Sequence, residues 1–190
     1  MELAGRYAAT GRNRVVETVA GTVGAPIVEE VHNHHNYAWW EEHFGERMLV
    51  VRKGATPAFP GQRGFVGGSM GDVSVILEGV ESELSAPSLY STVHGAGRVM
   101  SRTKAAGKFR QVKGRRVHQG GGEVDMDAVR RRIHDAGIVL KGAGADEAPE
   151  VYRRLPDVLA AQADTIRILR TLRPLVVVMA GEDEFDPYKD

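Results

Sequence analysis

Apolar residues recur at helical spacing in three segments of this chain. Over residues 2–20 they lie among alanine and arginine, and the stripe ends at Gly21. A second helix is expected to open at Asp125 and to end at Gly137. A longer amphipathic helix is expected to begin with Asp157 as its cap. Its apolar positions are Val158, Leu159, Ile166, Leu169 and Leu172.

Short apolar runs between glycines and prolines predict β-strands. We expect strands at 27–31, 47–53, 73–77, 88–93, 138–140 and 175–178. After the fourth of these, a glycine turn is expected to lead into a helix that runs through Lys104. Because strands gather in the middle and helices late, the pattern favours an α+β fold of mixed β-sheets with flanking helices. We expect a single domain over 1–190.

Composition limits the class of protein. The 190 residues include no cysteine, which excludes a disulfide framework and a thiolate zinc site and makes a reducing cytoplasm the expected location. No run approaches the roughly 18 apolar residues of a membrane span, so we expect no membrane partner. The 25 basic and 25 acidic side chains cancel, which argues against a uniformly basic nucleic-acid coat.

Charge is nevertheless segregated along the chain. An acidic tail occupies 182–190, with Glu182, Asp183, Glu184 and Asp186. The opposite sign dominates 98–116, which has eight basic residues and no acid. They are Arg98, Arg102, Lys104, Lys108, Arg110, Lys113, Arg115 and Arg116. This run could neutralise the phosphates of RNA or DNA, or it could be a solvated helix face, since only Phe109 offers an aromatic platform for bases.

A histidine cluster is the first candidate for chemistry. Four of the seven histidines are His32, His34, His35 and His43. Imidazole suits manganese, zinc, iron or nickel. Neighbouring residues of an extended segment face opposite sides, so only one of His34 and His35 is expected to be a ligand. The alternative is a set of polar histidines on a surface loop.

Two glycine-rich turns are the second candidate. GFVGGSMGDVS and HGAGR can bring backbone amides close to a phosphate. Neither matches the phosphate-loop or dinucleotide pattern, and a tight structural turn explains each alone. His94 adds a nucleophile beside the second turn, because neutral imidazole can attack a phosphate. Arg98 would lie on the same face as His94 if a helix begins at once.

Taken together, these residues resemble the RtcB family of RNA ligases. The motifs occur in the family's order over residues 30–181, which resemble its C-terminal half. They are HHNYAWWEEHFGE, VVRKGATPAFPGQRG, GGSMGDVSVILEG, HGAGRVMSRTKA, DEAPEVYRRLPDVLAAQ and LRPLVVVMAG. The resemblance implies the C-terminal portion of an RtcB-like fold.

The resemblance also implies an activity and a site. It implies a GTP- and manganese-dependent ligase that joins RNA 3′-phosphate or 2′,3′-cyclic phosphate ends to 5′-hydroxyl ends in tRNA splicing or RNA repair. His94 corresponds to the histidine that carries GMP, His35 to a manganese ligand and Asn36 to a residue beside the nucleotide. The guanylate pocket corresponds to Gly67, Gly68, Ser69, Met70, Ser74, Gly95, Ala96 and Gly97. By its charge and position, Arg98 is expected to stabilise nucleotide or RNA phosphate.

The chain departs from the family at three points. Met179 stands where the family has a guanine-recognising lysine, and Val93 stands where a cysteine is frequent. Family members are about twice as long, and their other metal ligands lie upstream of this sequence. The chain could therefore act with a missing N-terminal half or an accessory activator. The alternatives are a non-catalytic RNA-binding remnant, one half of a split ligase, or a metal-dependent phosphodiesterase acting on cyclic phosphate ends.

Overall fold

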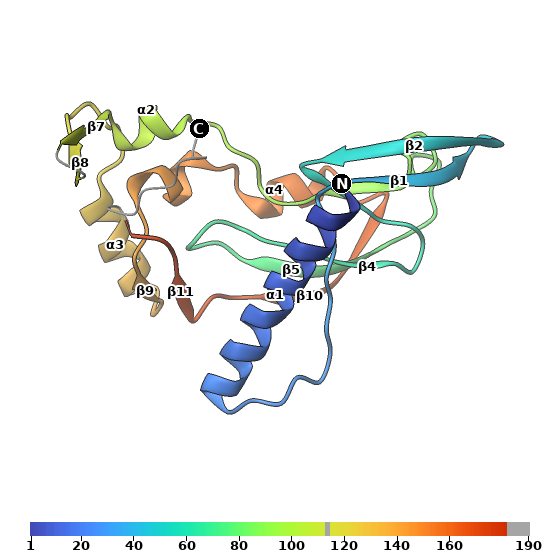
Figure 1. The fold of residues 1–190 in the computed structure, drawn as a ribbon, viewed down its shortest axis with the longest axis horizontal. Coiled ribbons are helices and arrows are strands. Elements are labelled where there is room, and N and C mark those ends of the chain that lie inside the picture. Colours follow the sequence, from blue (N-terminus) through green and yellow to red (C-terminus); the bar gives the residue numbers. More distant parts are fainter. Residues whose placement is uncertain (113–114, 182–190) are drawn as a thin grey trace. The chain divides into compact units, whose positions relative to one another are not determined.

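The computed structural model describes residues 1–112 and 115–181, so the acidic tail at 182–190 and Lys113 of the basic run lie outside the described residues (Figure 1). Helices and several small sheets are mixed along the chain, as the sequence predicted. The elements are α1 (Glu2–Val23), β1 (Asn36–His43), β2 (Glu46–Lys53), β3 (Ala55–Pro57), β4 (Arg63–Val66), β5 (Ser74–Gly79), β6 (Ser91–Val93), α2 (Arg102–Ala106), β7 (Phe109–Val112), β8 (Arg115–His118), α3 (Met126–Asp135), β9 (Val139–Lys141), η1 (Ala145–Glu147), η2 (Pro149–Val151), α4 (Leu155–Ala160), β10 (Ile166–Leu172) and β11 (Val176–Val178). Among the described residues, no helix combines the length and the apolar character needed to cross a bilayer.

The chain divides into two compact units. The first comprises Met1–Val66, Val75–His94 and Gln162–Arg170. The second comprises Gly67–Ser74, Gly95–Ala161 and the chain from Thr171 onward. The single domain expected over 1–190 stays a prediction, since compact units need not fold independently.

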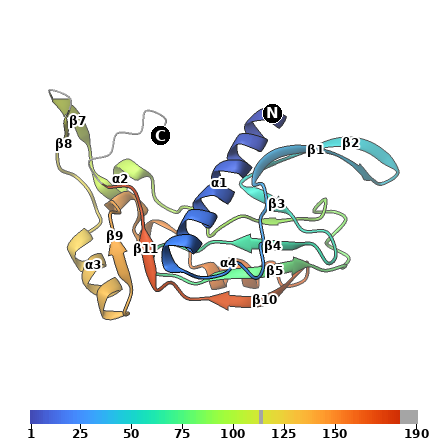
Figure 2. The ribbon, with the colours of Figure 1, turned by 60° about the horizontal axis from the view of Figure 1, so that its bottom comes forward.

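The first unit is built from antiparallel ladders. β1 and β2 form a long hairpin whose two loop residues, Phe44 and Gly45, both have positive φ (56° and 80°). This is the arrangement of a type I′ turn, whose twist matches that of the strands. β3 pairs with β6, and a three-stranded sheet has the order β10-β5-β4 (Figure 2). Val75 and Leu77 alternate with more exposed residues along β5 and are buried.

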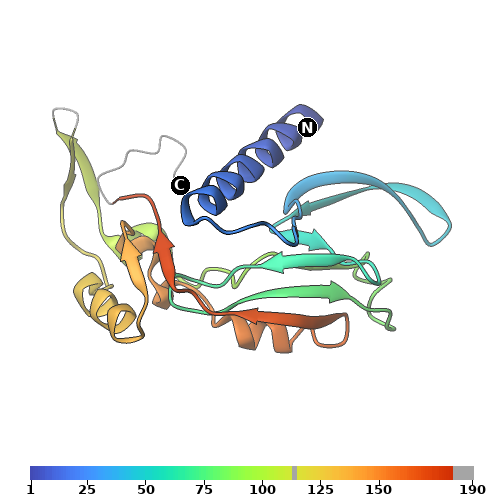
Figure 3. The same cartoon turned by 90° about the horizontal axis from the view of Figure 1, so that it is seen from below.

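The second unit packs around α3. Asp125 caps this helix, because its carboxylate accepts from the Asp127 and Ala128 amides at 3.0 Å each. Val129 and Ile133, four residues apart, face the core. The core cluster consists of Met70, Val129, Ile133, Ile138, Ala143 and Ala148. The parallel pair β9 and β11 lies beside α3 (Figure 3).

The long helix expected from Asp157 is wrong. α4 ends at Ala160, and the apolar residues of β10 belong to a strand beside β5. The amides of Thr165 and Ile166 bond back to the Gln162 carbonyl (2.9 and 3.2 Å), and this turn separates the two elements. The spacing of Ile166, Leu169 and Leu172 fits a helix, but pairing with a distant strand determines the structure here.

Three further elements differ from those that the sequence predicted. The strand expected at 27–31 is absent. This segment contacts β4 through the ion pair between Glu29 and Arg63, and it forms no backbone ladder with that strand. α1 continues past Gly21 to Val23, where the left-handed backbone of Gly24 (φ 68°) terminates it. None of the residues of α1 is buried. The strand expected over 88–93 is only β6, whereas those expected at 47–53, 73–77, 138–140 and 175–178 are confirmed to within two residues at either end.

Asp72 performs the capping that Asp157 was expected to perform. Its buried carboxylate accepts from the Leu155 amide (3.0 Å) at the start of α4, from the Val73 amide (2.9 Å) and from Arg154 Nε (3.2 Å). Burial by itself would raise the pKa of Asp72, but these hydrogen bonds outweigh it and hold the pKa below its ordinary value. The cap comes from a residue far away in the sequence.

We expect Asp72→Asn to lower the free energy of unfolding by about 1–3 kcal/mol near neutral pH, because charge-assisted bonds to a buried carboxylate are lost. Since the folded pKa lies below the unfolded one, this contribution is complete above the unfolded pKa and is lost as pH falls through the folded pKa. Urea unfolding at neutral and acidic pH measures it. Asp157→Asn, on the exposed side of α4, is the matched control. Equal losses in both variants at neutral pH would contradict the assignment.

Candidate functional site

His35 lies opposite a glycine in the first unit. In the β1–β2 ladder Asn36 pairs with Lys53, so the next position pairs His35 with Gly54. The Gly54 amide donates to the His35 carbonyl (2.8 Å) and also to the side-chain Oδ1 of Asn36 (3.1 Å). The two residues predicted as metal ligand and nucleotide neighbour are therefore anchored to one backbone amide.

His94 lies opposite the same glycine from the other side. In the β3–β6 ladder Ala55 pairs with Val93, so His94 follows opposite Gly54. The His35 and His94 rings stack with their centroids 5.1 Å apart and their planes 17° apart. Strands are about 4.8 Å apart, so side chains two strands apart rarely touch over an ordinary residue. The missing side chain of the central residue leaves the space for this contact.

Gly54 cannot easily be another residue. Its φ of 70° lies in the left-handed region, and a Cβ built there would lie 3.4 Å from both Cδ2 and Nε2 of His94. The Nε2 edge of the imidazole therefore faces the glycine. His94 is exposed to solvent at the same time.

The electrostatic setting favours neutral His94. Partial burial of the ring lowers its pKa from 6.5, and the electrostatic interaction with the His35 imidazole lowers it further. The neutral imidazole, which is the nucleophilic form, therefore predominates at neutral pH.

The other clustered histidines do not join this pair. His34 stacks on Tyr37 at 5.1 Å and meets His32 edge-on at 5.5 Å, while buried His43 bonds to Glu41 at 2.8 Å. Among residues 1–112 and 115–181, no group of three histidine or carboxylate side chains is placed to hold a metal ion. His35 alone of the cluster stacks on the candidate nucleophile.

The two glycine turns meet each other in the second unit. Gly67 and Gly95 form a parallel β-bridge. The Gly68 amide points to Ser74 Oγ at 3.4 Å, and any Cβ at Gly68 would overlap the Val73 carbonyl. The remaining predicted pocket residues of this unit are placed as follows: Met70 and Ala96 are buried, Ser69 is half-buried and Gly97 has φ 77°. Because the Met70 side chain is in the core, only its backbone remains for a ligand.

Arg98 occupies a network of its own in the second unit. It donates to the Asp146 carbonyl (2.7 Å), the Tyr152 hydroxyl (2.9 Å) and the Met100 carbonyl (3.2 Å), and it pairs with Glu147 at 3.5 Å. The helix expected after the HGAGR turn and through Lys104 is α2, but it starts only at Arg102, so Arg98 and His94 do not share a helix face. The physical reason is that Ser101, and no earlier residue, accepts from a first-turn amide.

Tyr152 extends this network. Burial and its hydrogen bond to Glu147 raise the pKa of Tyr152 to about 12, against the opposing charge of Arg98. The phenol therefore stays protonated at neutral pH and keeps its hydrogen bond to the carboxylate. Arg98 also lies over the phenol ring at 5.0 Å.

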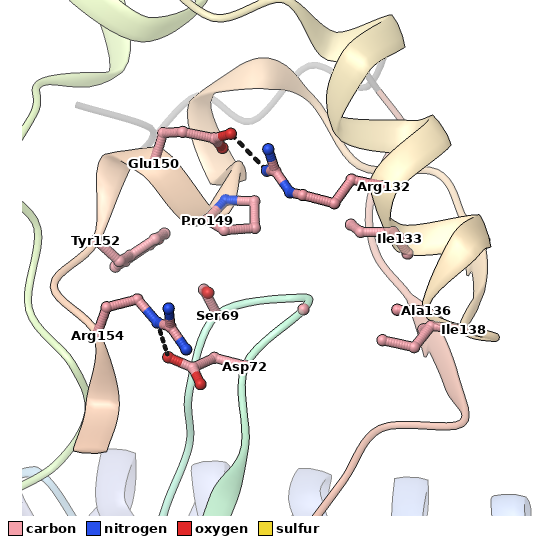
Figure 4. Close-up of a pocket in the computed structure, with 11 residues that line it drawn as sticks. Ser69, Asp72, Arg132, Ile133, Ala136, Ile138, Pro149, Glu150, Tyr152 and Arg154 are labelled. Atoms are coloured by element: carbon pink, nitrogen blue, oxygen red, sulfur yellow. Dashed lines mark hydrogen bonds and ion pairs between the residues drawn. The ribbon is translucent and has the colours of Figure 1, made fainter.

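A pocket of about 430 Å³ opens beside this tyrosine (Figure 4). Two ion pairs join residues that line it, one between Arg132 and Glu150 and one between Arg154 and Asp72. Its lining residues are Ser69, Gly71, Asp72, Arg132, Ile133, Ala136, Ile138, Pro149, Glu150, Tyr152 and Arg154. Of these, the sequence analysis identified only Ser69. Four others lie in the DEAPEVYRR motif, which was the available signal for them.

Comparison with known proteins shows which family this sequence resembles. The family model described as tRNA-splicing ligase RtcB matches residues 1–180. An RNA-splicing ligase RtcB of Escherichia coli K12 is 40% identical over 156 residues, which cover 80% of this chain and 33% of that protein. A tRNA-splicing ligase RtcB of Pyrococcus horikoshii is 34% identical and covered over 19% of its length. An RNA-splicing ligase RtcB of Mycobacterium bovis is 30% identical and covered over 43%. The chain thus spans less than half the length of these curated relatives.

We expect Gly54→Ala to slow modification of His94, because the new methyl group would lie against the Nε2 edge of the ring. The left-handed backbone should also cost about 1–2 kcal/mol of unfolding free energy. Gly61→Ala is the matched control: its φ is 77° but no atom lies within 4 Å of the added Cβ. Diethylpyrocarbonate labelling read by mass spectrometry measures the His94 rate. Equal slowing in both variants would show that strain alone, and not contact with His94, is responsible.

Proposed function

We propose a function from the fact that this chain belongs to the RtcB family of tRNA-splicing ligases. The chain supplies the nucleophile and nucleotide-binding turns of an RNA ligase that uses GTP and Mn²⁺ in the cytoplasm. This ligase joins RNA 3′-phosphate or 2′,3′-cyclic phosphate ends to 5′-hydroxyl ends, as tRNA halves or broken RNA. The observation that carries the proposal is the accessible, mainly neutral His94 stacked on His35 opposite Gly54.

His94 is the catalytic residue of this proposal. Its neutral ring nitrogen attacks the α-phosphorus of GTP, a P–N bond forms, pyrophosphate leaves, and the proton of the ring passes to solvent. The guanylate then moves to the RNA 3′-phosphate as the P–N bond breaks. Attack by the 5′-hydroxyl of the other RNA end forms the phosphodiester and releases GMP.

Backbone amides and one guanidinium bind the nucleotide in this proposal. Glycine turns allow close approach of amides to phosphate oxygens. The assigned residues are Asn36, Gly67, Gly68, Ser69, Met70, Ser74, Gly95, Ala96 and Gly97, and Arg98 is assigned to phosphate charge. All three side-chain nitrogens of Arg98 donate hydrogen bonds within the protein. These bonds hold the guanidinium in one position, which supports a role as a preorganised positive charge for phosphate.

A bound Mn²⁺ would require more ligands than the described side chains of this chain provide. His35 is the ligand that we assign to Mn²⁺, whose bound form would polarise phosphate oxygens. The absence of a three-donor group within residues 1–112 and 115–181 does not fit a complete metal site. The remaining ligands would come from a missing N-terminal half.

Incubation with α-labelled GTP and MnCl₂ is expected to attach GMP to His94, either in the chain alone or after addition of the upstream portion of a relative. His94→Ala should abolish the label, because the P–N bond has no acceptor. His134→Ala, whose ring is exposed on α3, should retain it. Tryptic mass spectrometry identifies the site. A reconstituted pair that takes no label would refute the proposed function.

The lack of a three-donor group in the described part of the chain and the short coverage of the relatives favour a second candidate. The chain alone could be a non-catalytic RNA-binding remnant or one half of a split ligase. Its binding would then depend on the basic run, where Lys108 and Arg110 are exposed.

A double Lys108→Gln and Arg110→Gln variant is expected to flatten the salt dependence of RNA binding. For single strands, the slope of log K against log salt should decrease by about 0.7 for each phosphate contact removed. Fluorescence anisotropy with a labelled single-stranded RNA at several salt concentrations measures the slope. Arg14→Gln, on exposed α1, is the control. If the chain is a remnant, the slope decreases in the double variant and the unsubstituted chain forms no GMP adduct. A slope that is the same in the double variant and in the unsubstituted chain would show that Lys108 and Arg110 do not contact RNA phosphates.

A further inference from the structure

A buried guanidinium connects the β1–β2 hairpin to the strand that ends before His94. Arg52 on β2 is only 2% exposed. It forms a two-pronged pair with Glu41 on β1, from Nη1 at 2.7 Å and from Nη2 at 3.0 Å. Its other side reaches toward β6: Nε donates to Ser91 Oγ (2.8 Å) and Nη2 to the Leu89 carbonyl (2.8 Å). One side chain therefore joins three segments.

The segment that Arg52 holds has an unusual backbone. Leu89 and Tyr90 are consecutive residues other than glycine with positive φ, at 53° and 48°. Each such residue costs on the order of 1 kcal/mol and persists only where its surroundings hold it. The Leu89 carbonyl accepts from both Arg52 and Ser91 Oγ (3.1 Å). Arg52 is thus one of the groups that hold the strained turn.

This turn sets where His94 lies. β6 contains only Ser91–Val93, and its ladder with β3 has three residue pairs. Such a short ladder contributes little against a shift of register. Ser91, which Arg52 contacts, is its first residue, and His94 follows its last. A change at Ser91 would move the His94 ring away from His35 and Gly54.

Aromatic and acidic neighbours keep Arg52 in place. Its guanidinium lies 5.1 Å from the Trp39 ring, and its partner Glu41 also bonds to His43. Burial would raise the pKa of Glu41, but the bonds from Arg52 and His43 lower it overall, so the carboxylate is charged near neutral pH. A buried pair of this kind is strongly destabilised when one partner is removed. Planar, two-pronged geometry also makes lysine a poor replacement.

We infer that Arg52 is a positioning residue for the nucleophile: through Ser91 and the Leu89 carbonyl, it fixes the register of β6 and so holds His94 against His35 opposite Gly54. The catalytic consequence of this inference rests on the proposed function. The geometric part does not, because ring contact between the two histidines can be measured without nucleotide.

Three substitutions test the inference in the full chain. Arg52→Lys keeps the positive charge but loses the two-pronged pairing with Glu41. Arg52→Ala leaves space that added methylguanidinium can fill. Ser91→Ala removes only the ties at β6 and leaves the Arg52–Glu41 pair intact, so it keeps the test valid if the Arg52 variants unfold. Arg47→Met is the matched control, because Arg47 lies on the same strand but its guanidinium covers Trp40 at 5.0 Å.

The first readout is the nuclear Overhauser effect between the His35 and His94 ring protons, in protein without nucleotide. We expect this signal in the unsubstituted chain and in Arg47→Met. It should weaken in Ser91→Ala and disappear in Arg52→Lys. Methylguanidinium, and not ammonium, should restore it in Arg52→Ala. Retention of the ring contact in folded Arg52→Lys and in Ser91→Ala would overturn the inference.

The second readout is the rate of GMP adduct formation, in the preparation that labels the unsubstituted chain. Displacing a reacting group by about 1 Å costs on the order of 100-fold, so the rate at saturating GTP should fall at least about tenfold in Arg52→Lys. The GTP concentration for half-maximal rate should change less than the rate, because all the residues assigned to the nucleotide except Asn36 belong to the second unit. A change confined to that concentration would overturn the positioning role. Absence of any adduct in the unsubstituted chain would refute the proposed function, while the ring contact would still decide the inference.

Discussion

The arrangement of the candidate site depends on a backbone position that has no side chain. Gly54 joins two ladders, β1–β2 on one side and β3–β6 on the other, and each ladder brings one histidine opposite it. An ordinary residue there would have a strained backbone and would place its Cβ against the His94 ring. The contact between two imidazoles, and the lowered pKa of one of them, follow from this local constraint together with partial burial. The chemistry proposed for His94 thus depends on the backbone conformation of Gly54.

Each compact unit holds a different part of the proposed chemistry. The first unit carries the paired imidazoles and the buried Arg52–Glu41 pair that reaches β6. The second carries the joined glycine turns, where close backbone approach is possible because Gly67 and Gly68 have no side chains. His94 and Gly95 are consecutive in the chain, so the nucleophile is covalently next to an amide of the second turn. Four of the six motifs quoted for the family contain these residues.

Local signals predicted some elements well and others poorly. α3 was predictable because its cap, Asp125, and its core residues, Val129 and Ile133, are all encoded within one short segment. β1 was not predicted, since its two-residue turn uses Phe-Gly in place of the usual Asn-Gly. β10 was mistaken for helix because its apolar spacing suits both structures and its partner strand is distant in sequence. Arg52 lies in the motif VVRKGATPAFPGQRG, but no local pattern indicated that its guanidinium reaches Ser91.

The sequence by itself determined the family, the candidate nucleophile and the glycine turns, because these are carried by residue types in short motifs with a defined order. It also limited the histidine cluster to one expected ligand, through the alternation of side chains in an extended segment. Only the tertiary structure decided which histidine meets His94, that Asp72 caps α4, and that Arg52 reaches Ser91. Each of these contacts joins residues far apart in the chain, and such contacts depend on strand register and burial, which no local pattern encodes.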